Sequence, residues 1–387
     1  MGHYNFDELP RRRGTSCEKW DTYPEDVLPM WVADSDFHSP PEISSALLDR
    51  VRLGVFGYSC DEPRRFEKAA VLWMRKRFSW EVDPSGVEFT PSVCTALAMA
   101  IQAYSRPGDK VLFQTPIYPP FRGLVQANKR LPLASPLLWK DGNYRIDFED
   151  LESKLADPAV TLFLLCNPHN PTGRAFTREE LLRMGELCLK HGVLIFSDEI
   201  HCDYVFARHG HIPFPSLGPE FARISAMAIN PSKTFNIADL RTAAVLLPHE
   251  DMRAPYRRTL RGCSLGRSSL GLLAFCLAYE RGDAYADEVR LYVEGNIDYA
   301  LSHIEARIPE IGAYKPEATY LLWLDCRKFG LEQDGLFSFF LDKAKLALSS
   351  GDIFGEEGKG FMRLNLACPR SLVEEALGRL ERAVRER

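Results

Sequence analysis

The chain has 387 residues, of which 45% are hydrophobic and 26% are charged, and its formal net charge is -5. These values are typical of a soluble globular protein with two or three domains, and the negative charge argues against nucleic acid as a partner. The longest apolar run, residues 270–279, is too short to span a bilayer, the first residues lack a signal peptide's apolar stretch, and the ten scattered cysteines form no C-x-x-C pair. We therefore expect a cytoplasmic protein with free thiols, no metal site and no membrane partner.

The first sixty residues contain few periodic elements. Arg11, Arg12 and Arg13 form the longest basic run, which we expect on a solvated N-terminal segment. Residues 26–34 are an apolar, strand-like stretch, and Ser39 begins a helix that reaches about residue 53. Tyr58 follows in a polar loop, where ordinary packing would explain it.

The next segment predicts a helix over residues 64–78 and a strand over 87–90. Residues 91–94 then begin a second helix, which covers 95–104. The junction before that second helix, at Val93 and Cys94, presents free backbone N–H groups and a positive dipole end to a phosphate. Every strand-to-helix turn has this equipment, so the indication is weak. A strand at 110–113 then leads to a rigid turn whose Tyr118 either lies over a flat cofactor or simply packs.

The middle of the chain alternates strands and helices. A buried strand at 160–166 runs into two Asn-Pro steps that hold Asn170, and Thr177 has the capping-box spacing for a helix to about residue 191. A strand at 193–196 then ends beside Asp198. This alternation predicts an α/β fold with a mostly parallel sheet covered by helices.

Lys233 lies at a short break between apolar, strand-like runs at 226–229 and 243–247. Three interpretations are open. The lysine can extend its amine to water, as most do. It can bind a phosphate, although the glycine-rich frame that usually presents such a lysine is missing. It can form a Schiff base, which needs a partly desolvated amine.

Asn170, Asp198 and Lys233 all follow strand carboxyl ends, where ligands bind in parallel sheets. Asp198 could instead cap the next helix. Pyridoxal 5'-phosphate needs a lysine, a carboxylate at its ring nitrogen, a donor to its phenolic oxygen, an aromatic neighbour and a phosphate cup. With Tyr118 and the helix start at residue 93, the three residues supply one of each.

The last third of the chain predicts a smaller α+β domain. Helical patterns cover residues 265–281, 284–308, 336–345 and 372–385, with strands at 320–324 and near Arg363. We therefore expect an N-terminal segment (1–45) that joins the small domain, a large cofactor-binding domain (46–282) and a small domain (283–387).

Several motifs in this order resemble a known family: N-P-H-N-P-T-G at 167–173, S-D-E-I-H at 197–201, P-S-K-T-F-N-I-A at 231–238 and G-F-M-R-L-N-L-A-C-P at 360–369. They resemble the fold-type I pyridoxal-phosphate enzymes of the class I/II aminotransferase superfamily, and most closely the MalY/PatB-type cystathionine β-lyases. The resemblance covers about residues 5–385. It implies the aspartate aminotransferase-like fold and a homodimer with its sites at the interface.

The resemblance also implies roles for single residues. Lys233 would hold the cofactor and move the Cα proton, and Arg363 would bind the substrate carboxylate, although its residue type alone indicates a surface ion pair. The cofactor would be held by Val93, Cys94, Tyr118, Asn170, Asp198, His201, Ser232 and Arg241, by Tyr58 of the other subunit, and by Lys233 itself. Tyr118 and Tyr58 would also serve catalysis, and Ala33 and Ser35 would line the substrate pocket.

The sequence departs from the family pattern at five positions: Ser35, Ser92, Asn230, Asp239 and Arg241. Asp239 and Arg241 could form a compensating pair, and an arginine at 241 is more usual in aminotransferases. The implied activity is α,β-elimination of cystathionine or another L-cysteine S-conjugate to pyruvate, ammonia and a thiol. The alternatives are an aminotransferase, a specialised enzyme that cleaves or decarboxylates a cysteinyl conjugate and, least favoured, a regulatory binding protein that retains the cofactor.

Overall fold

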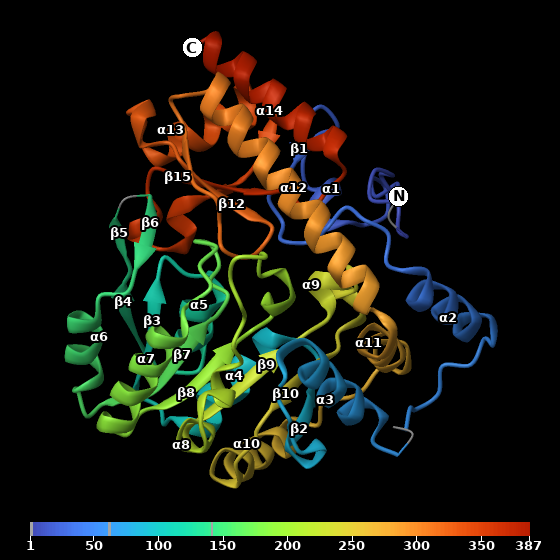
Figure 1. Ribbon diagram of the computed structural model, residues 1–387, viewed down its shortest axis with the longest axis vertical. Coiled ribbons are helices and arrows are strands. Elements are labelled where there is room, and N and C mark those ends of the chain that lie inside the picture. The colour runs from blue at the N-terminus through green and yellow to red at the C-terminus, as the bar shows by residue number, and fades with distance from the viewer. Residues whose placement is uncertain (1–2, 61–62, 141) are drawn as a thin grey trace.

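A seven-stranded sheet forms the centre of the computed structural model, which describes residues 3–60, 63–140 and 142–387 (Figure 1). The strands lie in the order β2 (Val87–Thr90), β10 (Ala243–Leu246), β9 (Ser225–Ile229), β8 (Leu194–Asp198), β7 (Val160–Cys166), β3 (Lys110–Thr115) and β4 (Leu131–Pro136). Only β10 pairs antiparallel to its neighbours. The predicted, mostly parallel α/β sheet is confirmed.

Helices cover both faces of this sheet because its strands are buried on both sides. On one face, α4 (Val93–Tyr104), α5 (Pro120–Ala127) and α10 (Glu250–Cys263) pack with Val111 and Phe113 of β3. On the other face, α6 (Phe148–Leu155), α7 (Arg178–His191) and α8 (Pro219–Ile224) pack with Leu112 of the same strand. The alternation along β3 follows the two-residue period of a strand.

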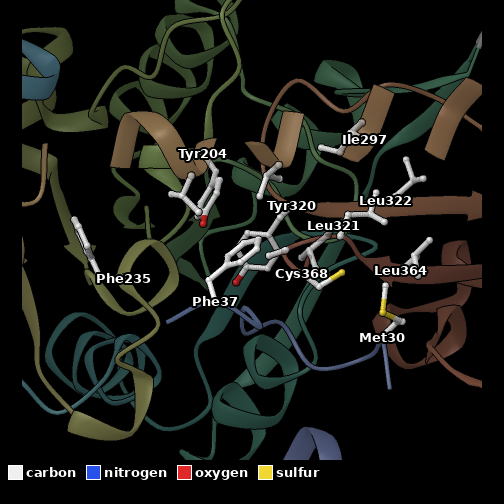
Figure 2. Close-up of a cluster of buried hydrophobic side chains, with 14 of the residues drawn as sticks. Met30, Phe37, Tyr204, Phe235, Ile297, Tyr320, Leu321, Leu322, Leu364 and Cys368 are labelled. Atoms are coloured by element: carbon white, nitrogen blue, oxygen red, sulfur yellow. The ribbon is translucent and has the colours of Figure 1, made fainter. Parts of the chain in front are cut away.

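A smaller antiparallel sheet follows in the chain, in the order β11 (Gly312–Ala313), β12 (Leu321–Asp325), β15 (Phe361–Asn365) and β14 (Ser349–Ser350). It lies with α14 (Arg370–Arg385), α13 (Gln333–Ser338) and α12 (Asp283–Arg307), a long helix that runs from this sheet toward the larger one (Figure 1). Met30 joins Ile297, Leu322 and Leu364 in one buried cluster (Figure 2). β1 (Leu28–Pro29) also pairs with β13 (Leu346–Ala347), so the N-terminal segment is attached to this part of the chain.

The remaining elements are short or lie outside the two main sheets. They are α1 (Glu18–Asp21), α2 (Pro41–Arg52), α3 (Arg65–Phe78), α9 (Ser232–Phe235), α11 (Ser269–Arg281) and the hairpin of β5 (Leu138–Lys140) and β6 (Asn143–Arg145). Among the described residues, no helix is both long and apolar enough to cross a membrane. Lys233 lies in α9, a helix of one turn, rather than in an open turn.

Several sequence expectations are wrong in detail. Of residues 26–34, only Leu28–Pro29 is a strand, because the carbonyls that follow accept side-chain donors instead of a strand partner. The helix expected over 336–345 is α13 followed by a π-helical turn that ends at Lys343. Arg12 and Arg13 are not solvated, since both guanidinium groups donate to carboxylates or carbonyls and are partly buried.

Candidate active site

Lys233 is fixed by the turn that follows β9. Asn230 Oδ1 accepts the Ser232 N–H at 2.8 Å, and Thr234 Oγ1 donates to Asp203 Oδ2 at 2.8 Å. The Lys233 amine donates to the carbonyl of Ala33, with 2.6 Å between Nζ and O. Asn230, one of the departures from the family pattern, thus braces the start of α9.

Burial lowers the pKa of Lys233, with Asp34 acting against this shift and Arg363 adding to it. Desolvation disfavours the ammonium form, and a nearby guanidinium does the same by repulsion. The lowered pKa makes the neutral amine accessible closer to physiological pH. A neutral amine is the form that acts as nucleophile or base.

Asp198 ends β8 and is buried. Burial raises its pKa to about 7, while the Ile200 N–H and Lys233 act in the opposite direction. The Ile200 N–H donates to Oδ1 at 3.1 Å, so the helix-start role considered for this carboxylate is partly realised as a local turn bond. Oδ2 accepts no hydrogen bond from the described residues, which leaves an oxygen that a cationic N–H donor would satisfy.

Asn170 and Arg363 meet across the two sheets. Asn170 lies in the turn after β7, and its Oδ1 accepts Arg363 Nη1 at 2.9 Å. Arg363 Nη2 donates to the Trp31 carbonyl at 2.9 Å and to Ser349 Oγ at 3.1 Å. The surface ion pair that its residue type suggested is wrong, because Arg363 is buried and lies on β15.

The environment of Arg363 favours an anionic ligand. Burial lowers the pKa of Arg363 to about 10, and the guanidinium carbon lies 4.8 Å from the centre of the Phe354 ring. Its Nε is buried and has no hydrogen-bond partner among the described residues. A desolvated guanidinium with a free N–H is suited to a carboxylate.

The first turn of α4 provides donors near Lys233. Ser92 Oγ accepts the Thr95 N–H at 3.1 Å, and the Ser92 carbonyl accepts Ala96. The amides of Val93 and Cys94 have no intrahelical partner, and neither donates within the described part of the chain. Ser92, one of the departures from the family pattern, is therefore a helix cap that leaves the other two amides open.

Cys94 lies near the charged side chains of Asp198, Lys233 and Arg241. Burial raises the pKa of Cys94 to about 11, an effect that Asp198 strengthens and that Lys233 and Arg241 oppose. Arg241 is exposed and has a left-handed backbone with φ of 50°. Among the described residues it forms no ion pair with Asp239, so the compensating pair is wrong.

Tyr118 and His201 lie in the same region. Burial raises the pKa of Tyr118 to about 12, with Cys94, Arg363 and Asp198 as charged neighbours. Burial lowers the pKa of His201 to about 3, and Lys233 and Arg363 add to the shift. His201 is therefore a neutral ring.

Tyr320 lies against His201, with 5.6 Å between the ring centres, and its hydroxyl donates to Ala33 O at 3.0 Å. It also makes an edge-to-face contact with Tyr204 at 4.9 Å (Figure 2). No role was predicted for Tyr320, although it opens the Y-L-L-W-L-D motif at 320–325. Its hydroxyl and the Lys233 amine share one carbonyl acceptor.

The other predicted residues are placed as follows. Ser232 is buried at the start of α9. Ser35 is also buried, and its Oγ has no partner among the described residues. Tyr58 is fully exposed. No role was predicted for Trp31, Ser349 or Asn365. Trp31 contributes a backbone carbonyl, and Ser349 and Asn365 donate to backbone carbonyls, roles that no particular residue type marks in a sequence.

These groups fit pyridoxal 5'-phosphate. The Lys233 amine can bind its aldehyde, and the unpaired Asp198 Oδ2 can accept the protonated ring nitrogen. The open amides of Val93 and Cys94 suit its phosphate. Burial raises the pKa of Asp198, and a cationic N–H donor at Oδ2 would lower it by favouring the carboxylate form.

Comparison with known proteins identifies the family. The sequence profile of the family described as aminotransferase class I and II matches residues 53–380. The chain is similar to the cystathionine beta-lyase PatB of Bacillus subtilis (strain 168), with 45% identity over 390 residues, 98% of this chain and 100% of that protein. It is 35% identical to the protein MalY of Escherichia coli (strain K12), over 99% of each chain.

A solved structure shows the same similarity in three dimensions. Cystalysin from Treponema denticola, whose crystal structure contains a pyridoxal 5'-phosphate cofactor, matches this chain with a TM-score of 0.95 and 31% identity. The match covers 99% of both chains. The similarity therefore includes both sheets and the N-terminal segment.

Proposed function

The chain belongs to the class I and II aminotransferase family, and from this premise we propose that it is a pyridoxal 5'-phosphate-dependent carbon–sulfur β-lyase. Its substrates would be cystathionine or other L-cysteine S-conjugates, cleaved to pyruvate, ammonia and a thiol. The observation that carries this reaction class is the 45% identity to PatB along 98% of the chain. The cofactor-holding residues alone would serve an aminotransferase equally well.

Lys233 is the group that would move the proton. When bound, the cofactor supplies an electron sink for the carbanion at Cα. The lowered pKa of Lys233 favours the neutral amine that acts as a base, and the Ala33 carbonyl at 2.6 Å orients it. Asp198, with its open Oδ2, would keep a ring nitrogen protonated.

Arg363 would bind the substrate carboxylate. Its Nη1 bond to Asn170 and its Nη2 bond to Trp31 fix the plane of the guanidinium. Its unpaired Nε is a donor that a carboxylate can take. An α-amino acid held there by its carboxylate would have its amino group and Cα in a fixed orientation, which favours reaction at Lys233.

A homodimer in the cytoplasm is part of the proposal. The segment after α2 exposes apolar side chains, with Leu53 at 67%, Val55 at 64% and Phe56 at 62% exposure, next to the fully exposed Tyr58. The segment follows α2, which packs on α11 at the edge of the molecule (Figure 1). A second copy of the chain would cover it and receive Tyr58 at its cofactor phosphate. All ten cysteines are free, as in a reducing compartment.

The test is an absorbance spectrum of the purified protein before and after addition of L-cystathionine, with pyruvate assayed in the same tube. A visible cofactor band and pyruvate formation support the lyase. A band without pyruvate, but with amino transfer to a keto acid, would make the protein an aminotransferase; Arg241 near Cys94 favours this alternative. A band with no turnover of either kind would indicate a specialised conjugate or a binding protein.

The dimer is tested by light scattering during size exclusion, with Phe56→Asp as the variant. We expect wild type at twice the mass of the chain and the variant at a lower mass. A monomeric wild type would contradict the dimer.

A further inference from the structure

Residues 31–36 are an irregular part of the N-terminal segment, which we call the carbonyl strap. Five successive backbone carbonyls, 31–35, each accept a side-chain donor. Two of these donors are central to the site: Lys233 Nζ lies 2.6 Å from Ala33 O, and Arg363 Nη2 lies 2.9 Å from Trp31 O. One short backbone segment thus contacts both the proposed base and the proposed carboxylate-binding group.

Four charged side chains hold one end of the carbonyl strap, and we call them the ion cluster: Arg12, Lys19, Asp34 and Asp36. Arg12 lies 2.6 Å from Asp34 Oδ2 and 2.6 Å from Asp36 Oδ1. Lys19 Nζ lies 2.6 Å from Asp36 Oδ2, and both of these side chains are fully buried. Two cations and two anions cancel, which lets such a cluster be buried.

The cluster also contacts the strap's backbone. Arg12 Nη1 donates to Ser35 O at 2.9 Å, and Lys19 Nζ lies 3.4 Å from Asp34 O. Trp20 Nε1 donates to Asp36 Oδ1 at 2.7 Å. Lys19 Nζ also lies 3.6 Å from Asp34 Oδ1, so removal of one charge would leave an excess of the opposite charge in a largely buried cluster and weaken the hold on the strap.

We propose that the ion cluster is the positioning device of this active site. It fixes residues 34–36 and thereby holds the carbonyls of Trp31 and Ala33 against Arg363 and Lys233. It sets how tightly an α-amino acid binds and how the reacting amine faces it. The inference rests on the proposed function, because it assumes that Arg363 receives the substrate carboxylate.

Arg13 provides a matched control. It is the same residue type on the same segment and is also partly buried. Its guanidinium donates to the carbonyls of Trp20 and Tyr23 at 2.7 and 3.1 Å, and to Val27 at 3.4 Å. None of these acceptors lies in residues 31–36. Arg12→Leu and Arg13→Leu therefore remove similar numbers of buried hydrogen bonds, but only Arg12→Leu disturbs the carbonyl strap directly.

The experiment is a titration of each holoenzyme with L-alanine, followed by the change in cofactor absorbance. L-Alanine has no leaving group at Cβ, so it reports binding without elimination. We expect Arg12→Leu to raise the Kd by about tenfold or more relative to wild type and to Arg13→Leu, because small misplacements of binding groups are costly. Melting temperature should fall in both variants, and further in Arg12→Leu, which also loses two ion pairs. Cofactor content should stay similar in the two variants, and Arg12→Lys should recover part of the affinity.

Equal values of Kd for Arg12→Leu and Arg13→Leu, or a wild-type value for Arg12→Leu, would overturn the proposal. If Arg12→Leu does not fold, Asp34→Asn replaces it, since it keeps an acceptor and removes one charge at a partly exposed position; an unchanged Kd there also overturns the proposal. A wild type that binds L-alanine but forms no pyruvate from cystathionine would contradict only the lyase function. A wild type that does not bind L-alanine would contradict both the proposed function and the positioning role of the ion cluster.

Discussion

The site has two halves that are held over different distances along the chain. Asn170, Asp198 and Lys233 lie at or after strand ends, and two of these turns are braced by bonds between residues two positions apart, from Ile200 to Asp198 and from Ser232 to Asn230. The carbonyl strap accepts bonds from Lys233, Arg363 and Asn365, which lie 200 to 333 positions away, besides its contacts with the ion cluster. The first half follows from local geometry once the sheet forms, whereas the second forms only when the N-terminal segment docks.

This contrast separates the functions of the halves. The sheet-end half carries the groups that would hold the cofactor and move a proton. The strap half, with Arg363, would bind and orient the substrate. Variants in the first half should therefore reduce turnover, while variants in the second should mainly weaken substrate binding.

The largest effect is expected at Lys233. Lys233→Ala removes the amine that would bind the cofactor and act as base, and should lower kcat by about a thousandfold or more. The visible band of the bound cofactor should shift or vanish. Pyruvate assays and absorbance spectra check this, and a variant with wild-type turnover would remove Lys233 from the mechanism.

Arg363→Lys tests the other half. Lysine keeps the charge but loses the flat fork, so KM for an amino-acid substrate should rise by about a hundredfold with a smaller change in kcat. The control is Arg327→Lys, since Arg327 also lies over an aromatic ring, at 4.9 Å from the centre of Phe361, but is exposed and paired with Asp325. Steady-state kinetics distinguish the two. A loss confined to kcat would contradict the assignment.

Asn365→Ala sharpens the comparison by loosening the carbonyl strap. Asn365 Nδ2 donates to the carbonyls of Val32 and Asp34, both at 2.6 Å. Its matched control is Asn296→Ala, because buried Asn296 Nδ2 also donates to two carbonyls, those of Leu366 and Cys368. Each variant should lose about 1–3 kcal/mol of unfolding free energy.

Only Asn365→Ala should also lower kcat/KM, by about tenfold, because only it frees the strap. Calorimetry and kinetics on both variants check this. Equal kinetic losses would mean that general stability, and not the strap, controls the rate.

The smallest effect concerns pH. The pKa of Asp198 is raised by burial to about 7, so the folded cofactor-free protein binds a proton that the unfolded chain releases between its ordinary pKa and about 7. Stability should therefore fall as pH rises through this window. His201, whose pKa burial lowers to about 3, acts in the opposite sense below its ordinary value.

The measurement compares melting temperatures of cofactor-free wild type and Asp198→Asn from pH 5 to pH 8. His201 is common to both proteins, so the difference isolates Asp198. Wild type should lose stability relative to the variant as pH rises, and parallel curves would contradict the raised pKa.

The sequence predicted the sheet well because local patterns determine its elements. The strands at residues 87–90 and 160–166 have the predicted bounds, and the capping box at Thr177 is present. Lys233, Asp198 and Asn170 were found for the same reason, since strand ends and turn residues mark them. Their roles in chemistry, and the division at residues 45 and 282, stay predictions.

The strap half could not be predicted because its features depend on tertiary contacts. Arg12 and Arg363 were expected at the surface, since the burial of an arginine is decided by distant partners and not by its neighbours in sequence. Residues 26–34 read as a strand by apolarity. Several of their carbonyls instead accept hydrogen bonds from side chains of α9, β15 and Lys19.

The carbonyl strap has a consequence for how this enzyme could diverge. Its contacts with Lys233 and Arg363 are made by main-chain oxygens, and every amino acid carries one. Substitutions at residues 31–35 can therefore change the shape of the wall without deleting an acceptor. Ser35, one of the departures from the family pattern, is one such change. A lineage could alter its choice of substrate here while it keeps its catalytic apparatus intact.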